Sequence, residues 1–253
     1  MKRLEGKAAI VTGGGKGIGF GVAKAFAAEG ANLVLTGRVE ARLKEAKESL
    51  EKEYGIRVIP VVADGADEGA VAGVVRTAVE EFGKLDIVVN NAQVSKSGVM
   101  LKDHTKEDFD LAINSGLYAA FFYMRAAYPY LKETKGSVIN FASGAGLFGK
   151  LGQSSYAAAK EGIRGMSRVA AAEWGPDGIR VNVVCPLAMT ESLEQWKNAY
   201  PDLYEKTIQG IPLGRFADPQ QDIGRVCVFL ASEDASYVTG ETITLQGGSG
   251  LRP

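Results

Sequence analysis

The sequence predicts an α/β protein built on one doubly wound, parallel, seven-stranded sheet with helices on both faces. Short runs rich in β-branched residues alternate with longer amphipathic segments almost from end to end, as in strand–helix–strand units. The short runs are apolar nearly throughout, which is typical of strands covered on both faces. We find no linker, repeat or low-complexity tract in the 253 residues, so we expect one domain spanning residues 1–253.

Each β-branched run is interpreted as a strand, and each amphipathic segment between two runs as a helix. The predicted strands are residues 8–12 (AAIVT), 32–36 (NLVLT), 57–63 (RVIPVVA), 86–90 (DIVVN), 137–141 (SVINF), 180–184 (RVNVV) and 242–245 (TITL). The predicted helices cover approximately residues 17–29, 39–54, 68–82, 106–131, 155–174 and 222–230. Thr105 precedes the longest helix and can cap it, with Asp108 three residues on.

One segment, at about 189–215, interrupts this alternation. It carries the residues Leu193, Trp196, Tyr200, Pro201, Tyr204 and Pro212. An insertion before the last helix–strand pair lies over the carboxyl ends of the strands, where open α/β sheets bind ligands. We therefore expect a substrate lid here, the alternative being a surface excursion.

Composition excludes several classes of protein. Lys and Arg number 29 against 30 Asp and Glu, which gives a net charge of −1, and 46% of positions are hydrophobic. This balance excludes a disordered chain and lacks the basic excess of a nucleic-acid binder. No stretch approaches the roughly 18 apolar residues of a membrane span, and residues 1–7 show no secretory signal. We expect a cytoplasmic protein without membrane or nucleic-acid partners.

Metal and histidine chemistry are not expected. The chain has two cysteines, Cys185 and Cys227, far apart in apolar stretches, and one histidine, His104. A structural zinc site needs about four clustered nitrogen or sulfur ligands. Buried thiols in a reducing compartment are the simpler interpretation. The single histidine also argues against a triad or dyad with a histidine base. Acid–base chemistry must then use Asp, Glu, Lys, Tyr or Cys.

A glycine-rich turn follows the first predicted strand. It reads Thr12-Gly13-Gly14-Gly15-Lys16-Gly17-Ile18-Gly19 and leads into the first helix. Free backbone N–H groups and the positive end of a helix dipole make such a turn an anion site. It is neither a P-loop nor a strict GxGxxG motif. The pattern favours a dinucleotide phosphate site over a merely tight turn.

The end of the second strand indicates which dinucleotide binds. NAD sites place an acid there to accept the ribose 2′-hydroxyl, whereas this strand ends at Leu35-Thr36-Gly37-Arg38. Arg38 can hold a 2′-phosphate bidentately, and Lys16 adds a second positive charge. NADP(H) is the expected cofactor. The alternative is that both are solvated surface cations.

A possible catalytic set lies in the second half of the chain. Tyr156 and Lys160 are spaced i, i+4, on one face of the helix predicted at 155–174. A neighbouring ammonium favours the phenolate and lowers the tyrosine pKa, so that Tyr156 can exchange a proton with an alcohol or ketone. Ser143, after the fifth strand, can hold the substrate oxygen. Asn114 lies in an otherwise apolar helical stretch, where an amide side chain indicates a functional or structural role.

With these residues the chain resembles the short-chain dehydrogenase/reductase family, whose fold is Rossmann-like. The resemblance covers nearly the whole chain and rests on Thr12-Gly13-x3-Gly17-x-Gly19, Asn90-Asn91-Ala92, Asn114, Ser143, Tyr156-x3-Lys160 and Thr239-Gly240. It implies that Tyr156 is the acid–base group, that Ser143 orients the carbonyl, that Lys160 also binds ribose hydroxyls and that Asn114 holds a water. It also implies a homotetramer. The residues expected to bind the cofactor are Gly13, Gly15, Lys16, Gly17, Ile18, Gly19, Arg38, Asp64, Asn90, Ala92, Tyr156, Lys160, Pro186 and Thr190.

The chain departs from the family pattern at a few positions. Gln93 and Leu187 stand where the family usually has glycine, Thr190 comes one residue early, and Gln246 replaces an aspartate. Gln93 and Leu187 belong near the mouth of the site, where they can reshape the pocket. None of these departures removes a catalytic group.

The expected activity is hydride transfer between NADP(H) and a secondary alcohol or ketone, with a bulky apolar substrate such as a hydroxysteroid. The alternative activity is that of a 3-oxoacyl-(acyl carrier protein) reductase. Those relatives dock an acidic carrier through basic residues, and this chain has Thr134 and Ala172 at the corresponding places, with Lys132, Lys135 and Arg168 close by. Alternatives of other classes are a non-catalytic NADP(H)-sensing regulator and an assembly scaffold.

Overall fold

The computed structural model describes residues 2–250 and has a seven-stranded sheet in which every neighbouring pair is parallel. The strand order is β3-β2-β1-β4-β5-β6-β7. The strands are β1 Ala8–Thr12, β2 Asn32–Gly37, β3 Val58–Val62, β4 Ile87–Asn90, β5 Ser137–Phe141, β6 Arg180–Pro186 and β7 Thr242–Leu245. The predicted fold class and its seven strands are confirmed, with strand ends shifted by at most two residues.

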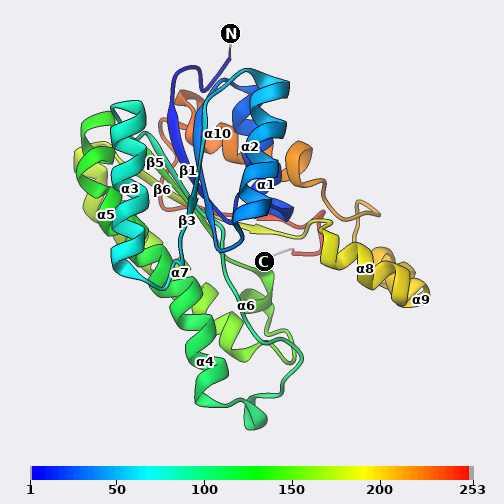
Figure 1. Cartoon of the computed structure of the whole chain (residues 1–253). Coiled ribbons are helices and arrows are strands. Elements are labelled where there is room, and N and C mark those ends of the chain that lie inside the picture. The colour runs from blue at the N-terminus through cyan, green and yellow to red at the C-terminus, as the bar shows by residue number, and fades with distance from the viewer. Residues whose placement is uncertain (1, 251–253) are drawn as a thin grey trace.

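The helices cover both faces of the sheet (Figure 1). They are α1 Gly17–Ala28, α2 Glu40–Tyr54, α3 Glu68–Phe82, α4 Lys106–Ala112, α5 Ala119–Thr134, α6 Gly144–Phe148, α7 Ser154–Trp174, α8 Glu191–Ala199, α9 Pro201–Gln209 and α10 Arg225–Ala231. Side chains from α1, α2 and α10 form the core on one face, and those from α3, α5 and α7 the core on the other. Residues alternate along each strand: Val11 packs on the first face and Ile10 on the second.

Local sequence explains several helix ends. The Asp67 side chain caps α3 by accepting a hydrogen bond from the Ala70 N–H. Gly55 and Gly83 end α2 and α3 in the left-handed conformation, at φ 68° and 73°, which glycine adopts without a steric penalty. Thr105 caps α4 by accepting from the Asp108 N–H, at 3.1 Å, as the sequence predicted.

The long helix predicted at 106–131 is not continuous. α4 ends at Ala112, residues Ile113–Tyr118 form a π-helical segment, and α5 then continues to Thr134. A second π-helical segment, Pro219–Gly224, precedes α10 where one helix was predicted over 222–230. Neither widened turn has a periodicity that distinguishes it from an α-helix in sequence.

Several further elements gather where the strands end. α4, α6, α8 and α9 all lie beyond the carboxyl ends of the parallel strands (Figure 1), which is the edge where doubly wound sheets bind ligands. The short helix α6 was not predicted. Within residues 2–250, none of the helices combines the length and the apolar character that crossing a bilayer requires. No group of three or more potential metal-ligating side chains lies together in that same range.

Candidate active site and dinucleotide cleft

The glycine turn between β1 and α1 has a backbone that favours glycine at two positions. Gly13 and Gly17 have φ of +67° and +55°. A Cβ on Gly19 would lie 2.4 Å from the Gly13 carbonyl oxygen, so the start of α1 closes directly on the turn. Lys16 precedes α1, and no side chain caps that helix start. Its first backbone N–H groups are therefore available to an anion.

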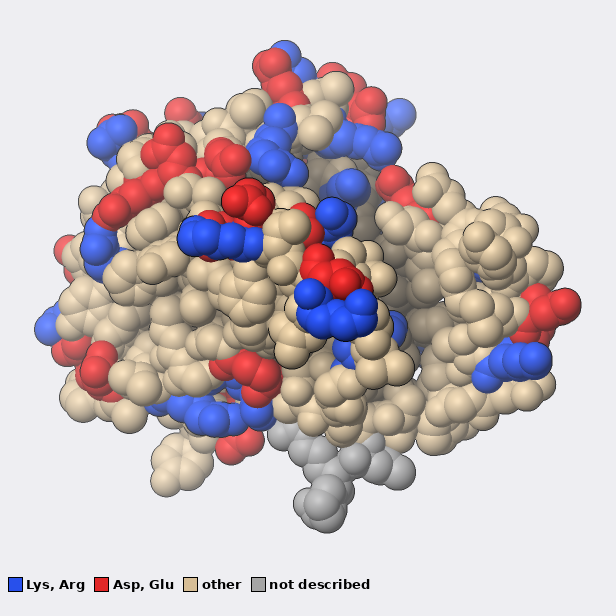
Figure 2. Space-filling model, turned by 90° about the horizontal axis from the view of Figure 1, so that it is seen from below, with Lys and Arg blue, Asp and Glu red and all other residues tan. Residues whose placement is uncertain are grey.

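This turn opens onto a cleft of roughly 670 Å³. Figure 2 shows the hollow between the body and the lobe formed by α8 and α9, with Lys and Arg side chains gathered at one end of it. Nine of the residues expected to bind the cofactor line it: Gly13, Gly15, Lys16, Gly17, Ile18, Arg38, Asp64, Ala92 and Thr190. Its size, the close backbone approach of the turn and its cations fit a dinucleotide.

The other five residues expected at the cofactor do not line this cleft. Gly19 packs on the turn, Asn90 lines a smaller pocket, and Pro186 is the last residue of β6. Tyr156 and Lys160 stand on α7. The cleft also has lining residues that sequence reasoning did not single out as cofactor ligands, including Arg42, Gln93 and Glu191.

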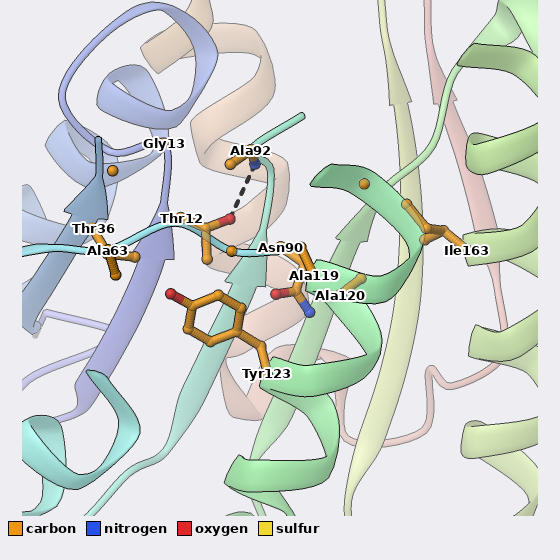
Figure 3. A pocket seen from close by; sticks show the side chains of 13 residues that line it. Thr12, Gly13, Thr36, Ala63, Asn90, Ala92, Ala119, Ala120, Tyr123 and Ile163 are labelled. Atoms are coloured by element: carbon orange, nitrogen blue, oxygen red, sulfur yellow. Dashed lines mark hydrogen bonds between the residues drawn. The ribbon is translucent and has the colours of Figure 1, made fainter. Parts of the chain in front are cut away.

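The smaller pocket, of about 30 Å³, adjoins the cleft between the ends of β1, β2 and β4 (Figure 3). Thr12 joins two of these strands, since its hydroxyl accepts hydrogen bonds from the Asn91 and Ala92 N–H groups at 2.9 and 3.0 Å. Tyr123 of α5 points its hydroxyl toward this space. Burial raises the pKa of Tyr123 to about 12, so it remains a neutral phenol there.

Asn90 belongs to a buried polar network rather than to the open cleft. Its side-chain amide donates to Asn140 Oδ1 at 2.8 Å, and Asn140 in turn donates to the Ser167 hydroxyl of α7 at 2.8 Å. The Asn90 Oδ1 atom is buried without a hydrogen-bond partner among the described residues. Such an acceptor at a strand end fits a site completed by a ligand or water.

The structure brings Ser143 and Tyr156 together. Ser143 follows β5, and its hydroxyl accepts a hydrogen bond from the Ala145 N–H at 3.1 Å, which starts α6. Tyr156 lies in the first turn of α7. Burial raises the pKa of Tyr156, and a hydrogen bond with Ser143 opposes that rise. A serine hydroxyl beside the phenol can therefore stabilise its charged form.

Lys160 differs from the sequence-based expectation. Its ammonium donates to the Phe141 carbonyl oxygen at 2.7 Å and lies 5.6 Å from the centre of the Tyr156 ring. Because the side chain is buried, the pKa of Lys160 falls to about 8. The expected lowering of the Tyr156 pKa by Lys160 is not seen in this arrangement, since burial dominates the tyrosine and Ser143 is the group that opposes it.

Asn114 lies on the π-helical segment that packs against α7. A Cβ on Gly162 of α7 would be 2.8 Å from Leu117, so the two elements are in close contact there. Asn114 itself is exposed. Asn114 is thus a polar, exposed residue within the widened turn of an otherwise apolar helical stretch.

Two of the departures from the family pattern fill space beside the site. Gln93 packs on Gly116 of the π-helical segment, and its amide is 3.4 Å from the Ala112 carbonyl oxygen. Gln246 is buried beneath Gly144, next to Ser143, where a Cβ on that glycine would meet the Gln246 amide at 2.3 Å. Gln246 also donates to the Cys185 carbonyl oxygen at 3.3 Å. Both glutamines therefore shape the backbone that carries the site.

No structural role for His104 is evident from the sequence, yet it contacts the start of α7. Its two ring nitrogens lie 2.9 Å from the Ser155 hydroxyl and 3.2 Å from the Ser154 hydroxyl. These serines immediately precede Tyr156. Only the fold brings residues fifty positions apart into contact, so the sequence carried no signal of this role.

The segment at 189–215 folds as α8 and α9 with a small core of its own. Tyr204, Ile211 and Phe216 are its buried residues. The rings of Trp196 and Tyr204 are 6.3 Å apart, and those of Tyr204 and Phe216 are 5.7 Å apart. Most of the aromatic surface therefore packs within the segment, while Tyr200 is exposed.

Comparisons with known proteins agree with this geometry. A family model described as enoyl-(acyl carrier protein) reductase matches residues 13–249. A 12α-hydroxysteroid dehydrogenase from a Clostridium species is 62% identical, with all of both chains covered. A 3-oxoacyl-(acyl-carrier-protein) reductase from Thermotoga maritima is 37% identical, over 97% of this chain and 98% of its own.

Solved structures give the same result. The structure of levodione reductase superposes with a TM-score of 0.92 at 33% identity, covering 98% of this chain and 99% of that one. Similarity of this extent in both sequence and structure covers the glycine turn, the sheet and the Ser143–Tyr156–Lys160 region together. The chain is therefore an oxidoreductase that belongs to the short-chain dehydrogenase/reductase family.

Proposed function

We propose that this chain is an NADP(H)-dependent dehydrogenase that interconverts the 12α-hydroxyl group of a steroid or bile acid and the corresponding ketone. The observation that carries the proposal is 62% identity, over the full length of both chains, to a protein named 12α-hydroxysteroid dehydrogenase. The relative from Thermotoga maritima named 3-oxoacyl-(acyl-carrier-protein) reductase is 37% identical. The steroid alcohol is therefore favoured over the acyl thioester.

The residues of the site supply the acid–base part of this reaction. In reduction, Tyr156 donates its hydroxyl proton to the carbonyl oxygen while the carbonyl carbon receives a hydride, and oxidation is the reverse. When bound, the nicotinamide cofactor is the hydride donor or acceptor. Ser143 orients the carbonyl by hydrogen bonding, and its contact with Tyr156 supports this role. The raised pKa of the phenol keeps its proton available at neutral pH.

Lys160 and Asn114 are assigned supporting roles. Lys160 binds the cofactor ribose, which is supported by its burial beside Tyr156 on the same face of α7. Asn114 holds a water in a proton relay, which is supported by its exposure on the π-helical segment packed against α7.

Arg38 and Lys16 select NADP(H) over NAD(H). Both line the cleft, and within residues 2–250 neither forms an ion pair with a carboxylate. An acid is also lacking at the tip of β2, which ends at Gly37. A 2′-phosphate would meet two available cations at this end and no repelling carboxylate from the strand.

α8 and α9 are proposed to act as a substrate lid. Thr190, Glu191 and Ser192 line the dinucleotide cleft directly, and Leu187, Met189 and Leu193 remain only partly buried against the small core of this segment. Those aliphatic side chains, rather than the buried aromatic rings, offer the surface for an apolar substrate.

A cytoplasmic homotetramer is the proposed state of the enzyme. Tyr118 and Phe121 expose aromatic surface on and beside the first turn of α5, and exposed apolar patches of this kind mark contacts between proteins. The two buried thiols, Cys185 and Cys227, fit a reducing compartment.

The test is a substrate panel followed by the near-ultraviolet absorbance of the nicotinamide. With NADPH, we expect rapid reduction of a 12-oxo bile acid and at least tenfold lower kcat/KM for its 3-oxo and 7-oxo isomers, which are matched in size and charge. Turnover of acetoacetyl thioesters without turnover of steroids would instead support the acyl-carrier reductase. Cofactor binding without turnover of any carbonyl would support a sensor, and failure to bind either dinucleotide a scaffold.

A further inference from the structure

Three cations converge at one end of the dinucleotide cleft. Lys16 comes from the glycine turn, Arg38 from the end of β2 and Arg42 from the first turn of α2, and all three line the cleft. The turn and α2 are in close contact, because a Cβ on Gly15 would lie 3.3 Å from the Arg42 backbone. The start of α2 thus places Arg42 beside the predicted phosphate site.

Arg42 differs from the other two because it has a counter-ion. Its Nη1 atom lies 3.3 Å from Oε1 of Glu191, and both side chains are about half exposed, at 48% and 54%. Within residues 2–250, neither Lys16 nor Arg38 pairs with a carboxylate in this way. One cation of the cluster is therefore neutralised, and by a residue from a distant part of the chain.

That counter-ion belongs to the proposed lid. Glu191 is the first residue of α8, directly after Thr190, whose hydroxyl caps the helix by accepting from the Leu193 N–H at 3.3 Å. Glu191 and Arg42 both line the cleft, from α8 and α2. The ion pair consequently links the start of the proposed lid to α2 at the cleft.

Charge makes this contact incompatible with a phosphate at the same place. A carboxylate beside a dianionic phosphate is repelled by it, whereas a guanidinium holds phosphate oxygens bidentately. An ion pair between two half-exposed side chains contributes little to stability. Exchange of the Glu191 carboxylate for a phosphate is therefore favourable for Arg42.

We propose that Arg42 is a third ligand for the 2′-phosphate of the cofactor, and that Glu191 is its counter-ion in the free protein. Phosphate binding then exchanges the Arg42–Glu191 pair for an Arg42–phosphate pair and releases the first turn of α8. This inference rests on the proposed preference for NADP(H). It adds a coupling between cofactor recognition and the lid, so that the phosphorylated cofactor itself loosens the segment over the substrate site.

The test compares 2′,5′-ADP with 5′-AMP, which differ only in the 2′-phosphate, by isothermal titration calorimetry. We expect Arg42→Gln to weaken 2′,5′-ADP about fivefold or more, which corresponds to roughly 1 kcal/mol, and to change 5′-AMP less than about twofold. Glu191→Gln should tighten 2′,5′-ADP about two- to fivefold, because Arg42 no longer has to leave a carboxylate. This gain should vanish in the double variant.

Two matched variants serve as controls. Lys44→Gln removes a charge from the same helix as Arg42, where Lys44 pairs with Glu40, and Glu194→Gln removes an acid from the first turn of α8. Both should leave the ratio of the two affinities unchanged. The fluorescence of Trp196, which lies on α8, should change on 2′,5′-ADP binding in the wild type but not in Arg42→Gln.

The outcomes separate this inference from the proposed function. If the wild type does not prefer 2′,5′-ADP to 5′-AMP, the NADP(H) preference is wrong and the inference falls with it. If the wild type prefers 2′,5′-ADP and Arg42→Gln keeps the full preference, only the role of Arg42 is wrong. A gain in Glu191→Gln that persists in the double variant would overturn the exchange.

Discussion

At the scale of single residues, the site combines a phenol that retains its proton with a hydroxyl that helps to release it. Burial raises the pKa of Tyr156, and its hydrogen bond with Ser143 opposes that rise. A group that stays protonated at neutral pH is suited to donate a proton to a ketone. Oxidation of the alcohol would instead require the phenolate of Tyr156 as the base. The hydrogen bond from Ser143, which favours the phenolate, is therefore most important in that direction.

Substitution of Tyr156 by phenylalanine removes only the hydroxyl group. We expect Tyr156→Phe to lower kcat by about a hundredfold or more, since general acid–base catalysis typically contributes 10²–10⁴-fold. Binding of NADPH should change by less than about twofold, because the ring still fills its place on α7. Initial rates and a fluorescence titration measure the two quantities. Turnover near the wild-type rate would assign the proton to another group.

At the scale of elements, the first turn of α7 is held from outside by the loop that precedes α4. His104 ends the 3₁₀ turn Leu101–Asp103 and contacts the hydroxyls of Ser154 and Ser155, two residues and one residue before Tyr156. Ser155 is fully buried. The helix that carries the proposed acid–base residue is thereby fixed to a segment fifty residues earlier in the chain.

Loss of these contacts should loosen that attachment. His104→Ala leaves two hydroxyl groups without a partner, and we expect the free energy of unfolding to fall by about 1–3 kcal/mol. Urea denaturation followed by circular dichroism gives this value, with an unchanged m value. Lys102→Ala, an exposed position in the same 3₁₀ turn, is the control. If the two variants are equally stable, the His104 contacts contribute nothing.

The elements also show which features a sequence predicts. The seven strands were predictable because apolar runs rich in β-branched residues favour buried strands. The glycine turn was predictable because glycine adopts the positive φ angles of Gly13 and Gly17 without a steric penalty. The π-helical segment around Asn114 was not, since the same residues fit an α-helix. The segment packs closely against residues distant in sequence, Gly162 of α7 and Gln93 after β4. Long-range contacts of this kind leave no local periodicity.

At the scale of the whole molecule, parallel strands bring distant residues to one edge. Ser143, Tyr156 and the glycine turn lie after or beside the carboxyl ends of different strands. The same arrangement places polar groups within the core, such as the Asn90–Asn140 hydrogen bond and the ammonium of Lys160. A buried charge lowers the stability of the folded state. The catalytic edge is therefore built at the expense of folding free energy.

Lys160 makes that effect measurable as a dependence of stability on pH. Its pKa is about 8 in the folded protein, against an ordinary value of 10.5. Between these two values the unfolded chain binds more protons than the folded one, so the free energy of unfolding rises with pH. Below pH 8 both states carry the charge, and the folded state bears the full penalty.

We expect the difference in the free energy of unfolding between the wild type and Lys160→Met to change with pH. The wild type should gain up to roughly 3 kcal/mol relative to the variant as pH rises from about 8 to 10.5, because each pKa unit corresponds to about 1.4 kcal/mol. Urea denaturation at a series of pH values measures the difference, in which contributions from other titrating groups cancel. Lys52→Met, at an exposed position on α2, should give a flat difference. A flat difference for Lys160→Met as well would mean that this ammonium is not desolvated in the folded protein.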